Sequence, residues 1–342
     1  MRRPTIADLA KTAGVSVATV DRVLSGRLKV REETSRKVFD AAEKIGFHGT
    51  NLIRQRLFAE LPEYRLGFIL RKERHTFYQS FAAELEHAVH GLRDYRIRLD
   101  VRFAQTSDPA EMVDLLNGFS GKVHAIGATG PDHHDVTSVI TALKEKGIPT
   151  FALLSDFAQG VREAYIGTNN IKVGRTAAWM ISRFSPRPGK VLLFLGGHRF
   201  QGHALRETGF RSYMREYAPQ FEVMDALVNL ETRGLTYEAL LGALARHDDM
   251  VGVYCAGGGM EGAIAALEEE GASRGIVCLV NELTPDSRKA LLDGTVTAVL
   301  HTPLRELCTD LISTMISTVE HGMAETPGQR FLPPQIWISE NL

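Results

Sequence analysis

The hydrophobic pattern of the first 45 residues predicts three short helices. Apolar positions recur every three or four residues, which places them on one face of a helix. Thr5 is the predicted N-cap of the first helix, with Asp8 three residues later as its capping partner. Gly14 breaks the pattern after the first helix, and Gly46 ends the third. The predicted segments are 5–13, 17–24 and 31–45. Three short helices with a glycine turn between the first two are typical of a helix-turn-helix.

The second of these segments has two different faces. Val20, Val23 and Leu24 form an apolar stripe, whereas Ala18 and Arg22 lie one turn apart on another side. The stripe is expected to dock on the other helices. The opposite face is then free to enter a DNA major groove, where arginine suits guanine and small apolar groups suit thymine methyls.

From Tyr64 onward, strand-like apolar runs alternate with helical segments, through about residue 293. This β-α alternation predicts parallel sheets with right-handed crossovers. Its length suggests two doubly wound lobes, with ligands bound at the carboxyl ends of the strands, where the lobes face each other. The expected fold class is α/β, a three-helix headpiece followed by a two-lobed core.

The expected domains follow from these changes in pattern. Residues 50–63 are expected to form a hinge or linker. A short helix is compatible with its sequence, but it has no obvious core to join, so its structure is expected to be conditional. The expected bounds are 1–49 for the headpiece and 64–342 for the core, with one lobe at about 64–166 and 284–325 and the other at about 167–283 and 326–342.

Composition and charge narrow the class of protein. The chain has 342 residues, 44% hydrophobic and 24% charged, with a net charge of −1, which is ordinary for a globular protein. Residues 1–60 carry 12 lysines and arginines against 7 acidic residues, whereas the remainder carries 28 against 34. A basic end on a mildly acidic body favours a local site for a polyanion.

The cysteines and the N-terminus indicate the compartment. Cys255, Cys278 and Cys308 lie in apolar runs without metal-ligand spacing, as expected for reduced, buried thiols. No signal-peptide pattern and no apolar run of about 20 residues are present. The expected location is therefore cytoplasmic, with no membrane partner.

The headpiece resembles a known family. Residues 5–26, TIADLAKTAGVSVATVDRVLSG, and residues 30–47, VREETSRKVFDAAEKIGF, are similar to the headpiece of the lactose-repressor (LacI/GalR) family of transcription regulators. The core is more loosely similar to that family's sugar-binding core, which shares its fold with periplasmic sugar-binding proteins. That similarity rests on segments such as IGTNNIKVGRTAAWMI (166–181) and ALRETGFRSYM (204–214).

The resemblance implies roles on DNA. The family reads bases from the positions held here by Val17, Ala18 and Arg22. Phosphate contacts, which position the protein without reading sequence, are expected from Thr5, Ser16, Thr19 and Arg27. Arg22 has the alternative of a solvated or phosphate-bound arginine, and Ser16 that of a plain N-cap.

Two features depart from the family. Asp21 stands where the family usually has a serine, so it either pairs with an arginine or accepts from a cytosine amino group. In the linker, the family's hinge helix inserts a leucine into the minor groove. Leu57 is the expected wedge, with Asn51 and Arg54 beside it, but the usual proline before the hinge is absent.

The resemblance and the strand ends together suggest a ligand site. Aromatic rings stack on sugar C–H faces, and planar charged or amide groups bond two hydroxyls at once. The candidates are Phe77, Tyr78, Asp132, Asn169, Arg206, Glu282 and His301, with Asn281 beside them. Phe77 and Tyr78 have the alternative of core residues at a helix start, and Asp132 that of a helix cap.

A glycine run and a histidine pair raise two further questions. After β-strand-like residues 250–257, the family commonly has Asn-Asp, whereas this chain has Gly257-Gly258-Gly259. A tight turn is the favoured interpretation. Anion binding by its backbone amides is the alternative. In the family the aspartate of this pair often binds ligand, and Glu282 is the candidate for the missing carboxylate. In residues 131–135, PDHHD, adjacent histidines are expected to diverge, so no metal site is predicted.

These observations favour a DNA-binding transcription regulator that acts as a repressor. Its effector is expected to be a sugar, a polyol or a sugar derivative. A homodimer bound to a pseudo-palindromic double-stranded operator is expected. The sequence leaves open whether the ligand induces or corepresses. The alternative is a solute-binding protein without a DNA role. No phosphate-binding loop or nucleophile elbow occurs, so neither an enzyme nor a cofactor is expected.

Overall fold

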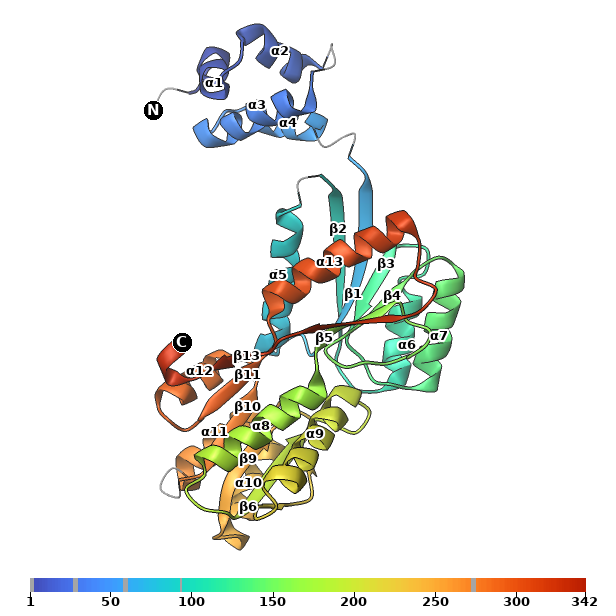
Figure 1. Ribbon diagram of the computed structural model, residues 1–342. Helices are drawn as coiled ribbons and strands as arrows, with labels where there is room; N and C mark the ends of the chain where they lie inside the picture. The colour runs from blue at the N-terminus through green and yellow to red at the C-terminus, as the bar shows by residue number, and fades with distance from the viewer. Residues whose placement is uncertain (1–2, 27–29, 58–60, 93, 272–274) are drawn as a thin grey trace. The chain divides into compact units, whose positions relative to one another are not determined.

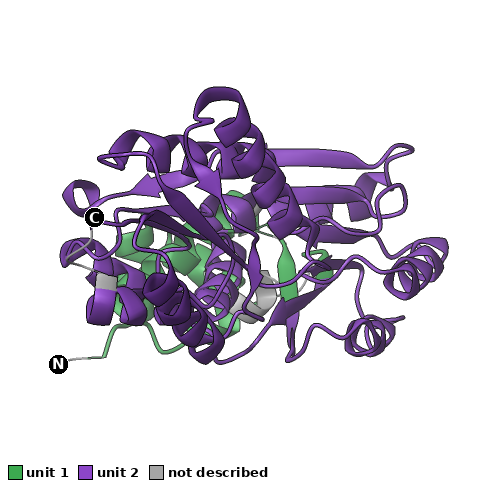
Figure 2. Cartoon of the chain, turned by 90° about the horizontal axis from the view of Figure 1, so that it is seen from below, with its two compact units in different colours: residues 1–64, 92–98 green, residues 65–91, 99–342 purple. Residues whose placement is uncertain are grey.

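The computed structural model describes residues 3–26, 30–57, 61–92, 94–271 and 275–342. The chain divides into two compact units, one formed by residues 1–64 and 92–98 and the other by residues 65–91 and 99–342 (Figure 2). Each unit has a hydrophobic core of its own.

The first unit is helical. Its helices are α1 (Ile6–Ala13), α2 (Val17–Ser25), α3 (Glu32–Ile45) and α4 (Thr50–Leu57). Thr5 and Asp8 form the predicted capping box of α1, and Gly14 ends that helix in the left-handed conformation, with φ 68°. Val20 and Val23 of α2 are buried in the shared core, as the apolar stripe predicted. The predicted helix-turn-helix is therefore confirmed.

The fourth helix corrects the expected linker. Residues 50–57 were expected to lack a core to join, but Ile53 is 0% exposed and belongs to the core of the first unit. The Phe47 amide donates to the Ala42 carbonyl of α3 at 2.9 Å, and the Ile53 amide donates to the Gly49 carbonyl at 3.2 Å. The prediction failed because Ile53 alone among the described side chains of α4 is buried, while Leu52 is 42% exposed, so the short segment shows no apolar face in the sequence.

The second unit contains two sheets with helices on both faces (Figure 1). The strands of the first sheet, in spatial order, are β12 (Gly328–Leu332), β5 (Ala164–Thr168), β4 (Thr150–Leu153), β3 (Ala125–Ala128), β1 (Glu63–Arg71) and β2 (Arg96–Ala104). The ladders that join β1, β3, β4, β5 and β12 are parallel. Its helices are α5 (Thr76–His90), α6 (Pro109–Asn117), α7 (His134–Glu145) and α13 (Leu304–His321).

The second sheet repeats this plan. Its strands, in spatial order, are β13 (Gln335–Trp337), β11 (Ala298–His301), β10 (Val277–Asn281), β9 (Met250–Cys255), β6 (Lys190–Leu195) and β7 (Glu222–Val223), with β8 (Leu227–Val228) also paired to β6. Only β13 runs antiparallel to its neighbour among the described ladders. Its helices are α8 (Asn170–Phe184), α9 (Gln201–Tyr217), α10 (Arg233–Arg246), α11 (Met260–Ala266) and α12 (Pro285–Leu292). Helix α11 continues as a π-helix (Leu267–Gly271), and a 3₁₀ turn (Ser339–Asn341) follows β13. The α/β fold class is confirmed.

The lobe boundaries differ from the predicted ones. Residues 285–301 form α12 and β11 of the second sheet, because β10, α12 and β11 make one parallel crossover unit. Residues 328–332 form β12 of the first sheet, where Arg162 Nη1 donates to the Gly328 carbonyl at 2.8 Å. The chain therefore crosses between the lobes after β5, after β11 and after β12.

Both sheets reverse their winding where the lobes face each other. In the first sheet the chain winds to either side of β1, and in the second to either side of β6. Such switch points open a crevice at the carboxyl ends of the strands. Close packing of α8 on α9 positions one wall, because a Cβ on Gly174 would lie 1.9 Å from the Arg206 carbonyl oxygen.

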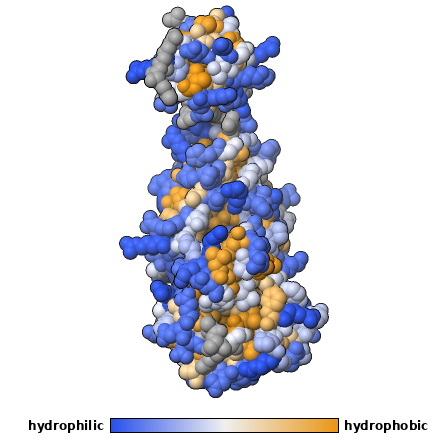
Figure 3. All heavy atoms as spheres, turned by 90° about the vertical axis from the view of Figure 1, so that its left-hand side faces the viewer, coloured by the Kyte–Doolittle hydropathy of each residue, from blue (hydrophilic) through white to orange (hydrophobic). Residues whose placement is uncertain are grey.

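None of the helices in the described part of the chain combines the length and hydrophobicity needed to span a bilayer. On the face shown in Figure 3, apolar residues gather in patches within a largely hydrophilic surface.

Candidate functional site

The outer face of α2 is open to solvent. Val17 is 53% exposed, and Ala18, Asp21 and Arg22 are also exposed, whereas Val20 on the opposite side is fully buried. The residues that the resemblance assigns to base reading therefore share the free face of a helix docked by its other side. This is the geometry that a recognition helix requires.

The predicted phosphate contacts have local partners as well. Ser16 Oγ accepts from the Thr19 amide at 3.1 Å, and the two hydroxyl oxygens lie 2.8 Å apart. Thr5 Oγ1 donates to Asp8 at 2.7 Å. Ser16 is thus the N-cap of α2, and its phosphate contact stays a prediction.

Several predicted DNA contacts are only partly placed. Asn51 is exposed on α4. Arg54 and Leu57 lie in the last turns of α4, and their side chains, like Arg27, lie outside the described residues. Among the described residues, no ion pair joins Asp21 to an arginine, so its role also stays a prediction.

The second candidate site is a cavity of about 60 Å³ between the two lobes of the second unit. Four of the predicted ligand residues line it, namely Phe77, Tyr78, Arg206 and Glu282, together with Asn281. Gly257 and Gly258, which the sequence analysis had singled out, also line the cavity. The sequence analysis did not identify the other lining residues, which are Arg71, His75, Thr129, Leu154, Ser155, Phe200, His203, Glu231 and Met260.

Arg206 is fixed by two buried hydrogen bonds. Its Nε donates to Asn170 Oδ1 at 2.7 Å, and its Nη1 donates to the Ala256 carbonyl at 2.7 Å. The first acceptor lies at the start of α8, and the second lies directly after β9. The guanidinium is therefore held in one orientation at the cavity wall.

Glu282 is held by residues at the end of β11. Its Oε2 lies 3.0 Å from His301 Nδ1 and accepts from the Thr302 amide at 2.9 Å, while Oε1 accepts from the Thr302 hydroxyl at 2.7 Å. Burial would raise the pKa of Glu282, but these hydrogen bonds and nearby charges lower it instead. His301 does not line the cavity; it positions the carboxylate that does.

Asp132 and Asn169 are not in the cavity wall. Asp132 is exposed, and its Oδ1 accepts from the Ala158 amide at 3.1 Å. The cap of α7 is His133, not Asp132. Asn169 caps α8, and its neighbour Asn170 makes the bond to Arg206. Neither asparagine lines the cavity, so a ligand contact by Asn169 stays a prediction, whereas Asn170 acts on the site through Arg206.

An ion-pair cluster crosses the cavity. Arg71, at the end of β1, is 3% exposed, and its Nη2 lies 3.3 Å from Glu231 Oε2 in the other lobe. Its guanidinium carbon lies 4.1 Å from the centre of the Phe200 ring, within the range of a cation–π contact. Lys72 Nζ lies 3.7 Å from the same carboxylate.

Burial and charge oppose each other at this cluster. Burial would raise the pKa of Glu231, but Arg71, His203 and Lys72 outweigh it and lower the pKa to about 2. Burial lowers the pKa of His203 to about 4, although Glu231 acts in the opposite direction. At neutral pH the carboxylate is ionised and the imidazole is neutral.

The cavity also holds polar atoms without partners. Among the described residues, six buried side-chain nitrogen or oxygen atoms have no hydrogen-bond partner. Four of them belong to cavity-lining residues: Arg71 Nε, His75 Nδ1, Thr129 Oγ1 and His203 Nδ1. Unsatisfied buried polar groups are costly, so their gathering here marks a place for a polar ligand.

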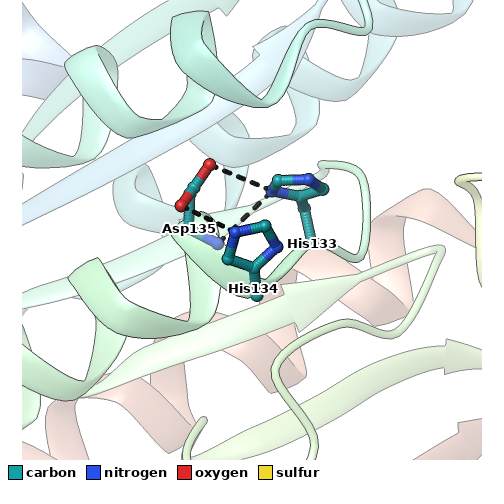
Figure 4. A group of neighbouring side chains, drawn as sticks. All are labelled: His133, His134 and Asp135. Atoms are coloured by element: carbon teal, nitrogen blue, oxygen red, sulfur yellow. Dashed lines mark hydrogen bonds and ion pairs between the residues drawn. The ribbon is translucent and has the colours of Figure 1, made fainter.

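The histidine pair lies differently from the prediction. The rings of His133 and His134 have centres 4.2 Å apart, and Asp135 lies 3.4 Å from one and 3.1 Å from the other (Figure 4). The expected divergence is wrong, because His133 turns back to cap α7. His133 Nδ1 already accepts the Asp135 amide, and His134 is 81% exposed, so the prediction of no metal here stays a prediction.

Comparison with known families gives two matches. Residues 66–319 match the family described as periplasmic binding protein domain, and residues 5–49 match the bacterial regulatory proteins of the lacI family. Together the two matches cover the cavity and the helix-turn-helix.

Similar proteins agree with these matches. An uncharacterized HTH-type transcriptional regulator in the aml 5′ region of Streptomyces limosus is 25% identical over 62% of this chain and 58% of its own length. The sucrose operon repressor of Streptococcus mutans is 25% identical over 65% of each chain. The match thus spans less than two thirds of either relative.

A solved structure shows the same fold in the core. The solute binding protein of an ABC transporter from Burkholderia graminis, in complex with D-arabinose, has a TM-score of 0.75. It is 18% identical, and the match covers 82% of this chain and 97% of that protein.

Proposed function

Because the chain belongs to the periplasmic binding protein domain family over residues 66–319 and carries the N-terminal domain of the lacI family of bacterial regulatory proteins, we propose that it is a ligand-controlled DNA-binding transcription regulator. One observation carries the proposal. The same chain has a docked helix with a free outer face and a cavity with unpartnered buried polar atoms between two lobes.

The free face of α2 is the proposed recognition surface. Val17, Ala18 and Arg22 read base edges, while the basic charge of the first unit draws the phosphate backbone. Repression is the proposed direction of control, and the name of the Streptococcus mutans relative supports it. Since transcription regulators act on chromosomal DNA, the proposed location is the cytoplasm.

The cavity is the proposed effector site. Arg206 and Glu282 are fixed donors and acceptors, and Phe77 and Tyr78 supply apolar surface, the combination that sugars require. The arabinose complex of similar fold supports a sugar-like ligand. Neither a cofactor nor a catalytic step is part of the proposal.

A homodimer is the proposed assembly. Two first units placed by a two-fold axis match two half-sites of a pseudo-palindromic operator. Large apolar side chains exposed on the second unit support an interface, and they include Trp179, Phe184, Leu292 and Ile336. Sedimentation velocity of the full chain is expected to give a dimer; a monomer at micromolar concentration contradicts this part.

The test of DNA binding begins by selecting bound sequences from random double-stranded DNA with the full chain. We expect a pseudo-palindromic site, an affinity that falls steeply with salt, and a change of about 5–150-fold when the effector binds. No sequence enrichment, or an affinity insensitive to salt, contradicts DNA recognition and favours the solute-binding alternative.

A further inference from the structure

One loop from each lobe meets the other across the cavity. The first lobe, built on the first sheet, contributes the residues directly after β1, and the second lobe contributes a loop just after β8. Lys72 Nζ donates to the Leu230 carbonyl at 2.9 Å and to the Glu231 carbonyl at 3.1 Å. Arg71 Nη2 lies 3.3 Å from Glu231 Oε2. We call these four residues the latch.

A second set of contacts between the lobes adjoins a crossing of the chain. Asn170, which follows the crossing after β5, donates from Nδ2 to the Leu154 carbonyl at 3.1 Å. The Gly202 amide donates to Ser155 Oγ at 3.0 Å. Contacts beside a hinge change little when lobes rotate about it. The latch loops are not crossing segments, so an opening rotation is expected to separate them while the contacts near Asn170 remain.

Both halves of the latch have an unusual backbone conformation. Lys72, Leu230 and Glu231 have φ values of 40°, 50° and 53°, which residues other than glycine rarely adopt. In the described part of the chain, six residues other than glycine have a positive φ, and three of these six belong to the latch. Strain of this kind gathers at clamps and switch regions, where the surrounding structure holds it in place.

Each lobe positions its own half of the latch. In the second lobe, Asn229 Oδ1 accepts from the Glu231 amide at 2.9 Å. A Cβ on Gly258 would lie 2.9 Å from Glu231 Cβ, so the glycine leaves the space in which the Glu231 side chain lies. In the first lobe, the Lys72 amide donates to the Ala104 carbonyl at 2.8 Å. These contacts stay within one lobe, so the latch groups are oriented before they meet, which lowers the cost of closing.

Lys72 acts between the lobes rather than on a ligand. Arg71 and Glu231 line the cavity, whereas Lys72 does not. Burial lowers the pKa of Lys72, although Glu231 acts in the opposite direction. The ammonium group is thus partly withdrawn from water, and it gains the two carbonyl acceptors only when the lobes are together. Since water replaces those acceptors on opening, the net gain on closing is modest, and a single side chain can shift the balance.

We propose that Lys72 and the loop at residues 230–231 form a latch that sets the equilibrium between open and closed lobes without contacting the effector. A ligand shifts such an equilibrium only by its differential affinity for the two states. The strength of the latch therefore fixes how far an effector can change operator affinity. The inference rests on the proposed function for this effect on DNA, and on the contacts between the lobes for the latch itself.

Förster energy transfer between dyes on the two lobes measures the opening in the full chain. Exposed Glu145 of α7 and Glu222 of β7 are changed to cysteine for labelling, since the native cysteines are buried. Labelled chains are diluted into unlabelled ones, so that transfer occurs within one chain. Lys72→Met keeps the aliphatic stem and removes the donors, and we expect the open population to rise about fivefold or more. Lys72→Arg keeps the charge and the donors, and a population within about twofold of wild type is expected.

The second lobe offers an independent variant. Gly258→Ala displaces Glu231 from within its own lobe, and the open population is expected to rise as it does in Lys72→Met. Gly234→Ala is the matched control, because a Cβ there meets no atom within 4 Å. Lys122→Met is the control in the first lobe, since Lys122 is exposed and lies outside the latch. Both controls are expected to give wild-type energy transfer.

The outcomes separate the latch from the proposed function. Wild-type energy transfer in Lys72→Met and Gly258→Ala, with folding verified by thermal melting, overturns the latch. An equal rise in Lys72→Met and Lys72→Arg also overturns it, because the donors are then not the cause. If Lys72→Met opens the lobes, its affinity for the selected operator is expected to change about threefold or more, and an unchanged affinity overturns control of DNA binding by the latch. A wild-type chain that binds no operator overturns the proposed function, and energy transfer still decides the latch.

Discussion

The two candidate sites keep their polar groups available in opposite ways. On α2 of the first unit, Ala18 and Arg22 lie in water, and their helix is held by residues on its other face. In the second unit, Arg71, Thr129 and His203 are enclosed, each with one atom unpartnered. An exposed polar group keeps its hydrogen bonds to water, so it costs almost no folding free energy. An enclosed polar group loses water and needs a surrounding hydrogen-bond network to offset that loss. Mutations on α2 should therefore change binding alone, and mutations in the cavity should change binding and stability together.

The largest expected effect is at Arg206. Arg206→Ala removes two buried hydrogen bonds that a charged group donates. Asn170 Oδ1 and the Ala256 carbonyl then each lose the donor that they have in the wild-type protein. We expect a loss of about 4 kcal/mol in the free energy of unfolding of the second unit, since such bonds contribute about 1.5–3 kcal/mol each, and loss of effector binding. Urea denaturation measures the first quantity and calorimetry the second.

A control lies on the same helix. Arg215 is exposed on α9, and Arg215→Ala is expected to stay within about 0.5 kcal/mol of wild type. If Arg206→Ala is equally neutral for stability, the cavity network is not what holds this wall, and the contrast with α2 fails.

Arg22 provides the opposite test. Arg22→Ala is expected to weaken operator binding by about 1–3 kcal/mol, the range for a bidentate contact to a base, and to change stability by less than about 0.5 kcal/mol. Fluorescence anisotropy and thermal melting measure the two quantities.

Arg22→Lys separates base reading from phosphate contact. A lysine keeps the charge but not the planar fork, so a base contact is lost while a phosphate contact survives. Equal affinity of Arg22→Lys and wild type for the selected operator would assign Arg22 to the phosphate backbone.

The pH dependence of stability follows from His203. Its pKa is about 4 in the folded protein against 6.5 for the free side chain, so the unfolded chain takes up a proton first as the pH falls. The stability that neutral His203 contributes is present above pH 6.5 and lost between 6.5 and 4. We expect the second unit to lose about 2 kcal/mol between pH 7 and 5 through this group. The charged groups around His203 are Glu231, Arg206 and Arg71.

His203→Gln isolates this contribution. The variant is expected to lose about 2 kcal/mol less than wild type over the same pH interval in urea titrations. Each protein is compared with itself at two pH values, so any constant loss of packing cancels. Parallel pH profiles for the two proteins would contradict a buried neutral imidazole.

The two sites also differ in how far sequence alone predicts them. On α2 two of the proposed base-reading residues are neighbours at i and i+4, so helical periodicity finds Ala18 and Arg22 without knowledge of the fold. The cavity assembles loops far apart in sequence, so periodicity cannot find Arg71 and Glu231, which meet across two lobes. Arg206 and Glu282 were found because the family resemblance or a strand end marked them.

The fold shows the same division. The β-α alternation predicts both lobes, but it does not say to which sheet a late strand returns. β12 joins the first sheet by a parallel ladder with β5, beside which Arg162 bonds to Gly328, and β13 pairs with β11 in the second sheet. Ile53 was misjudged for a related reason, since a segment of eight residues with Leu52 beside Ile53 gives no clear periodicity. Local patterns predict elements, and long-range contacts decide where they go.

The smallest expected effect is at Ser16, where capping and phosphate contact overlap. Ser16→Ala removes the bond from the Thr19 amide and is expected to cost about 1 kcal/mol of stability in the first unit. Ser16→Asp keeps an N-cap, and its negative charge interacts favourably with the positive end of the α2 dipole, so we expect stability to be retained. The same charge repels a phosphate. If Ser16 contacts the backbone of DNA, Ser16→Asp lowers operator affinity although the unit is fully folded. Operator affinity equal to that of wild type would make Ser16 a cap alone, and the exposed site would then depend on α2 side chains for its contacts.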